Sequence, residues 1–175
     1  MLDILRRRRS IRRFAEKEIE AEKIAALKEA ILRAPTSRGL NSWEFIFVDD
    51  RELLHRLAQA RRHGSAFLAG AKLAVVVAAD PERCDVWIED CAIAAIVLQL
   101  AAVSLGLDSC WAQIRLREHD ERTGAGDYVR RLLGLPERFQ VACVIGIGYA
   151  AEQKESHARD SLPWDRIHDN RYRGE

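Results

Sequence analysis

The chain has 175 residues, of which 48% are hydrophobic and 31% are charged, and this balance excludes a disordered chain. Lysine and arginine number 28 against 27 aspartate and glutamate, so the net charge of +1 creates no general basic field that would attract nucleic acid. Any site that binds an anion must therefore depend on a local cluster of positive charges.

Apolar spacing predicts that two helices open the chain. The first is short, at residues 2–5, and the second runs from about Ile19 until Pro35 stops it. Residues 45–48 form an aromatic and β-branched segment that is typical of a strand. One of the two aspartates at 49 and 50 is expected to cap the helix that follows.

The second half of the chain alternates strands and helices. Residues 73–77 are an apolar run typical of a central strand, and Asp80-Pro81 ends it with turn chemistry. Further elements are predicted as a helix from about 86 to Gly106, a strand at 109–114, a helix around 128–133 and a last core strand at 141–147. The tail from Ala150 is polar and poor in helix signals.

No repeat, linker or composition break divides the chain, so we expect one α+β domain over residues 1–175. The helix around Ile93 to Val103 is apolar on every face. It is buried either within a monomer core or against a second copy in a twofold homodimer. The apolar stretch is interrupted by Gln99 and Ser104 and falls short of the roughly 20 residues of a spanning helix, which predicts no membrane span.

The cysteines show no metal-site or disulfide pattern. No C-x-x-C pair and no zinc-ligand spacing occurs among Cys84, Cys91, Cys110 and Cys143, so we expect reduced, buried thiols and no metal. The arginines near the N-terminus are not followed by the apolar run of a secretory signal. These features predict a cytoplasmic protein.

The first candidate site is the basic segment Arg8-Arg9-Ser10-Ile11-Arg12-Arg13-Phe14. Guanidinium groups are permanently charged bidentate donors and a serine hydroxyl adds a hydrogen bond, which suits a phosphate. Ile11 and Phe14 can anchor the segment to the core. The alternative is a nucleic-acid module that uses residues 6–13, but the acidic residues at 16, 18, 20 and 22 follow at once. Arg6, Arg7 and Arg13 are interpreted as surface charge.

Two further motifs follow in order. The first is a loop of small polar residues between a helix and a strand, with the sequence Ala34-Pro35-Thr36-Ser37-Arg38-Gly39-Leu40-Asn41-Ser42-Trp43. Such loops surround polar planar ligands. Gly106-Leu107-Asp108-Ser109-Cys110-Trp111 comes after the long apolar helix, and Val144-Ile145-Gly146-Ile147-Gly148-Tyr149 ends the core. A Rossmann motif is discounted, because no helix follows these last glycines, which instead allow close packing in a strand.

The order and spacing of these motifs resemble the FMN-dependent nitroreductase family over nearly the whole chain. The resemblance implies a three-layer α/β/α sandwich around a mixed, mainly antiparallel sheet, with a helix buried in a homodimer. It implies an enzyme that passes a hydride from NADH or NADPH through FMN to a nitroaromatic, quinone or similar acceptor by a ping-pong mechanism. A dehalogenase-type activity on the same fold is the alternative within this class.

The resemblance also implies which residues bind FMN at the dimer interface. Phosphate and ribityl ligands would be Arg8, Arg9, Ser10 and Arg12, with Arg12 able to reach the pyrimidine side of the ring. The partner subunit would present the ring-side loop, with Thr36, Ser37, Arg38, Gly39 and Asn41. Backbone groups near flavin N5 would come from Ala112, Gln113 and Ile114, and the tail residues Arg171 and Arg173 would close on the phosphate.

This chain departs from the family pattern in the ring-side loop. Gly39 stands where asparagine is usual, Asn41 where glutamine is usual, and Ser42 replaces proline. No side chain is expected to act as a general acid or base, because the flavin carries the chemistry.

Overall fold

Four strands with alternating or continuous apolar residues build a central sheet in the computed structural model, which describes residues 1–174. The strands are β1 (Trp43–Val48), β2 (Leu73–Ala79), β3 (Asp108–Gln113) and β4 (Gln140–Gly148), in the order β1-β2-β4-β3. All three pairings between neighbours are antiparallel. The sheet is mainly antiparallel, as expected, and parallel pairing among the described residues is confined to an isolated bridge between Ser10 and Ser109.

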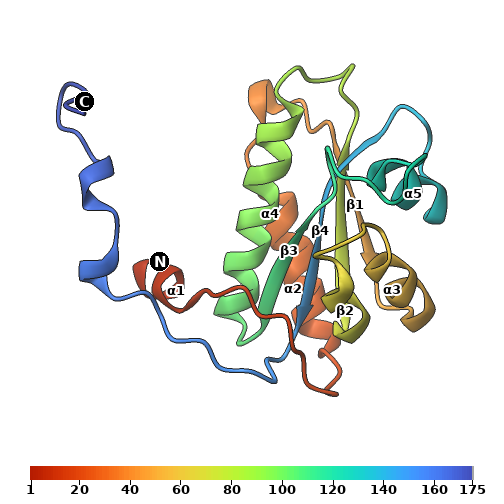
Figure 1. Ribbon diagram of the computed structural model, residues 1–175, viewed down its shortest axis with the longest axis horizontal. Coiled ribbons are helices and arrows are strands. Elements are labelled where there is room, and N and C mark those ends of the chain that lie inside the picture. Colours follow the sequence, from red (N-terminus) through yellow and green to blue (C-terminus); the bar gives the residue numbers. More distant parts are fainter. Residues whose placement is uncertain (175) are drawn as a thin grey trace.

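Helices cover both faces of the sheet, as expected for three layers (Figure 1). On one face lie α2 (Ala21–Leu32) and α4 (Trp87–Ser104), and on the other lie α3 (Arg51–Ala58) and α5 (Ala125–Leu132). Val75 and Val77 of β2 pack with the α4 side, whereas Ala74 and Val76 pack with the other side. This alternation follows from the period of two in a strand and makes two cores from one sheet.

A β-bulge interrupts the pairing of β2 with β4. The register shifts between Val77 and Ala78, so Ala142 is an extra residue on β4. Ala142 and Cys143 consequently both pack on the α4 side. The Ala142 carbonyl accepts the backbone N–H groups of Ile114 and Arg115, at 3.2 and 3.1 Å, just beyond the end of β3. The bulge thus fixes the direction in which the chain leaves β3.

Single residues explain the start of α3 and the close packing of the last strand. Asp50, not Asp49, caps α3, because its Oδ1 accepts the Leu53 N–H at 2.8 Å. A β-carbon on Gly146 would lie 2.9 Å from Phe67 and Leu68 side-chain carbons, and one on Gly148 would lie 2.9 Å from the Phe14 ring. Close packing in the last strand is therefore the reason for these glycines, as predicted.

The helix α4 is long and apolar enough, by length and composition, to cross a bilayer, with a mean hydropathy of 1.6. Core helices of soluble proteins pass the same test. Its inner face packs on the sheet, but Ile88, Ile93 and Ile96 remain 36–38% exposed on its outer face. Burial within one chain, the first explanation offered by the sequence, is therefore incomplete.

The two ends of the chain extend from the sheet. A short α1 (Leu2–Arg7) precedes the basic segment, and the tail after Tyr149 projects away from the body with two short 3-10 helices (Figure 1). The tail exposes Leu162, Trp164 and Ile167. Glu175, the last residue of the expected domain 1–175, lies outside the described residues.

Candidate functional site

The basic segment is bonded to the edge of the sheet. The Ile11 N–H donates to the Ser109 carbonyl on β3 at 3.0 Å, and the Ala15 N–H donates to the Tyr149 carbonyl at 2.8 Å. Ile11 and Phe14 are buried and pack together with Ala71. The predicted anchoring role of these two apolar residues is confirmed. The arginines of the basic segment are therefore attached to a fixed backbone.

The cations of this segment lack partners that would neutralise them. No salt bridge joins Arg8, Arg9 or Arg12 to a carboxylate within residues 1–174, whereas Arg7 pairs with Asp3 at 3.0 Å. Arg8 and Arg9 are half-buried. The Arg7 pair agrees with its interpretation as surface charge. Unpaired guanidinium groups at a fixed edge form a place where an anion would be bound.

Two tail residues that were not predicted from the sequence contact the basic segment. Lys154 Nζ donates to the Ser10 carbonyl at 2.7 Å, and the Glu152 carboxylate accepts the Arg12 N–H at 2.6 Å. Burial raises the pKa of the Cys110 thiol on β3, and Arg12 and Lys154 partly oppose this rise. Both cations therefore act on the same short stretch of β3.

The ring-side loop lies near the opposite end of α4. Ser37–Gly39 forms one 3-10 turn between α2 and β1, where α4 begins, whereas the basic segment lies toward the end of α4 (Figure 1). The 18 residues of α4 span about 27 Å. Within one chain, the structure does not bring the two predicted halves of the site together.

The loop itself has an unusual backbone that side chains hold in place. Arg38, Gly39 and Asn41 have φ angles of 53°, 65° and 47°. The Thr36 hydroxyl donates to Asn41 Oδ1 at 2.9 Å and accepts the Asn41 N–H at 3.2 Å. Arg38 pairs with Asp85 at 2.6 Å. Left-handed conformations at non-glycine residues cost free energy, so this loop is retained by its contacts.

The end of β3 carries the three residues predicted to lie near the flavin ring. Ala112 and Ile114 are buried, and Gln113 is half-buried with its amide bonded to Trp111 Nε1 and the Arg115 carbonyl. Arg61 Nη1 donates to the Gln113 carbonyl at 3.0 Å. Arg61 was missed by sequence reasoning, because no motif marks it and the contact spans 52 residues.

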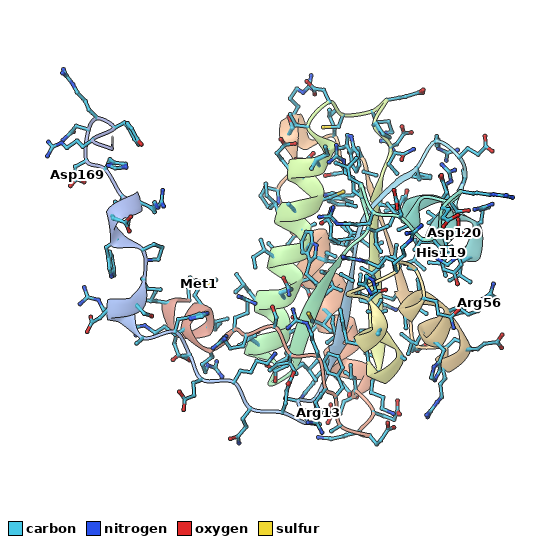
Figure 2. The ribbon with its side chains drawn as sticks, in the orientation of Figure 1. Met1, Arg13, Arg56, His119, Asp120 and Asp169 are labelled. Carbon is cyan, nitrogen blue, oxygen red and sulfur yellow. The ribbon has the colours of Figure 1, made fainter. Side chains whose placement is uncertain are left out.

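The tail arginines are separate from the basic segment in one chain. Asp169, two residues before Arg171, lies on the projecting tail, whereas Arg13 lies at the edge of the sheet (Figure 2). Arg171 and Arg173 are exposed. Their contact with a phosphate stays a prediction.

The cysteines are free and buried, as predicted. Burial, with Asp90 and Cys84 nearby, raises the pKa of Cys91 to about 12, and burial raises the pKa of Cys143 as well. These thiols stay protonated and pack as small apolar side chains. Among residues 1–174, no group of three or more histidine, cysteine or acidic side chains is arranged to hold a metal ion.

The fold and these segments define a class: a three-layer α+β protein with a cationic segment fixed to the edge of an antiparallel sheet. The family model described as "Nitroreductase family" matches residues 5–64 and 54–149. The chain belongs to the nitroreductase family, which is a family of oxidoreductases.

Individual relatives agree over nearly the full chain. A protein of Archaeoglobus fulgidus named as an NADH dehydrogenase/NAD(P)H nitroreductase is 37% identical over 172 residues, with 95% of each chain covered. The solved structure of an FMN-dependent nitroreductase from Clostridium difficile is 45% identical, with a TM-score of 0.96, covering 98% of this chain and 100% of that one. A solved relative from Bacteroides thetaiotaomicron is 33% identical, with a TM-score of 0.88, covering 98% and 97%.

Proposed function

We propose that the protein is an NAD(P)H-dependent flavin oxidoreductase that binds FMN at the interface of a homodimer. The observation that carries the proposal is the set of guanidinium groups at Arg8, Arg9 and Arg12, which form no salt bridge within residues 1–174, on the same segment as Ser10, which is bonded to β3. This donor set fits a phosphate dianion. The 45% identical relative is named an FMN-dependent nitroreductase, which supports FMN as the phosphate-bearing group.

The length of β3 supports the placing of the two ends of the cofactor. Ser109 contacts the basic segment, and Gln113, four residues later, contacts Arg61. Four strand residues span about 13 Å, so the basic segment and Arg61 mark two separate ends of β3. The phosphate would lie at Arg8 to Arg12, and the ring near the backbone of Ala112, Gln113 and Ile114.

The dimer supplies what one chain lacks. The ring-side loop, with Thr36, Ser37, Arg38, Gly39 and Asn41, lies too far from its own basic segment to share a cofactor with it, so it would serve the partner's site. The exposed isoleucines of α4 and the apolar side chains of the projecting tail support burial against a second copy. Arg171 and Arg173 would reach a phosphate only across this interface.

Bound FMN would supply hydride transfer at N5, from NADH or NADPH to a nitroaromatic, quinone or similar acceptor in a ping-pong sequence. The protein's own residues bind and orient. Arg12 remains the candidate cation for the pyrimidine side of the ring, and Arg61 adds a second cation at the Gln113 end. Free, buried cysteines support a reducing, cytoplasmic location. No observation favours the dehalogenase-type or nucleic-acid alternative.

The visible spectrum of the purified protein tests the proposal. We expect flavin absorption bands, release of FMN on denaturation, and bleaching by NADH or NADPH under anaerobic conditions. Reoxidation by a quinone or nitroaromatic, without release of the flavin, would follow. A colourless protein that takes up no added FMN would overturn the proposal.

A further inference from the structure

Two polar side chains are buried on the inner side of α4, which is otherwise apolar there. Asp90 is 3% exposed and lies in the first turn, and Gln99, nine residues later, is 5% exposed. A buried carboxylate or amide costs free energy unless hydrogen bonds compensate it. Each side chain therefore needs a partner, and the partners lie in the two halves of the proposed site.

Asp90 holds the ring-side loop. Its Oδ1 accepts the backbone N–H of Ser37 at 3.0 Å, and its Oδ2 lies 3.4 Å from the Cys84 thiol, which donates to it. Ser37 begins the single turn that contains Arg38 in its left-handed conformation. A hydrogen bond to a carboxylate is stronger than one between neutral groups. The first turn of α4 thus fixes the loop from its buried side.

Gln99 holds the strand to which the basic segment is bonded. Its Nε2 donates to the Ser109 hydroxyl at 3.1 Å, and Ser109 is itself 1% exposed. The carbonyl of Ser109 accepts the Ile11 N–H, and Ser10 pairs with Ser109. A chain of contacts therefore runs from the C-terminal half of α4 to the backbone that carries Arg9 and Arg12.

We propose that Asp90 and Gln99 are positioning residues, one for each half of the proposed flavin site, and that α4 sets the distance between the halves. The inference rests on the proposed function. Nine helical residues separate the two side chains by about 13.5 Å along the axis. Because the loop and the basic segment of one chain would serve different sites, α4 also connects the two sites of the dimer.

Binding of FMN and of riboflavin, which lacks the phosphate, separates the two roles. For Gln99→Met, and for Ser109→Ala as a second variant, we expect the FMN dissociation constant to rise about tenfold, the effect of losing one good hydrogen bond to the phosphate. Riboflavin binding should change little. The ratio of the riboflavin and FMN dissociation constants measures the preference for FMN. A general loss of stability does not change this ratio.

Asp90→Ala should act on the other half. We expect a shifted flavin absorption spectrum and an acceptor KM raised about fivefold, of the order of one weakened contact, with the preference for FMN over riboflavin retained. Asp90→Asn keeps an oxygen that can accept the Ser37 N–H, so it should restore most of the wild-type behaviour. Cys91→Ala, fully buried and adjacent on the same helix, is the control for lost packing.

The outcomes are distinct. If wild-type protein binds FMN but Gln99→Met and Ser109→Ala keep the wild-type preference for FMN, or Asp90→Ala keeps the spectrum and the KM, the inference is wrong. Equal changes in Cys91→Ala would also overturn it, because they would reveal a packing effect. A wild-type protein that binds no flavin would overturn the proposed function and, with it, this inference.

Discussion

A fixed backbone holds the charges of Arg8, Arg9 and Arg12 in place for binding. An exposed arginine that pairs with a neighbour, as Arg7 does with Asp3, contributes little to stability. Arg8, Arg9 and Arg12, which form no salt bridge with any carboxylate of residues 1–174, instead lie on a segment bonded to Ser109 and anchored by Ile11 and Phe14. Their mutual repulsion would be relieved by a bound anion, so they are expected to contribute to binding more than to folding.

Arg8→Ala or Ser10→Ala is expected to weaken FMN retention. Loss of one hydrogen bond to a charged group costs about 1.5–3 kcal/mol, which corresponds to a rise in the dissociation constant of roughly ten- to hundredfold. Fluorescence titration with FMN measures this change. Arg6→Ala removes an equal charge from α1 and is the matched control. Variants that purify as yellow as the parent would contradict the expectation.

Arg38→Ala is expected to change acceptor kinetics more than FMN binding. Arg38 belongs to the ring-side loop and is held by Asp85 at 2.6 Å, at the opposite end of α4 from the basic segment. Asp85→Ala, which releases the same side chain, should shift kcat/KM for the acceptors in a related way. Steady-state assays with a quinone and a nitroaromatic compare the two variants. Unchanged acceptor kinetics in both would refute this role.

At the scale of elements, turns and caps are set by single residues with local partners. Asp50 caps α3 because its carboxylate reaches the Leu53 N–H, while Asp49 makes no such bond. The β-bulge at Ala142 is different, because it depends on pairing with β2 and directs the chain after β3. A local signal therefore sets where α3 begins, whereas pairing between distant strands sets how the chain leaves β3.

Asp50→Ala is expected to lower the free energy of unfolding by about 1 kcal/mol, the usual cost of losing an N-cap. Urea unfolding at one fixed protein concentration measures this change, so that association of chains does not alter the comparison. Asp49→Ala is the matched control, and it should stay within about 0.5 kcal/mol of wild type. Equal losses in the two variants would indicate a general charge effect.

Viewed as a complete molecule, one chain carries the two parts of the proposed flavin site at separate places. Its basic segment and its ring-side loop lie toward opposite ends of α4, and α4 exposes Ile88, Ile93 and Ile96 (Figure 1). The tail projects from the body with further apolar side chains exposed. A second copy related by a twofold axis would cover these surfaces and join a basic segment to a ring-side loop at each of two sites.

Replacing Ile93 and Ile96 together by glutamate is expected to disrupt the dimer and release FMN, because charges would be buried without partners at the interface. Light scattering after size-exclusion chromatography should give twice the 19.9 kDa chain mass for wild type and the single mass for the variant. His55→Glu, on α3 across the sheet, should remain dimeric. A wild-type monomer that retains FMN would contradict the interface site.

The helices and strands could be predicted from the sequence, because their signals are local. Apolar periodicity located the helices and strands, paired apolar residues predicted the anchoring of the basic segment, and the two glycines of β4 predicted close packing. The all-antiparallel sheet and the choice of Asp50 over Asp49 required the structure. The residues that hold the candidate site also required it: Asp90 meets Ser37 across 53 positions, and Lys154 meets Ser10 across 144. Such contacts arise only when the fold brings distant segments together, so no local pattern encodes them.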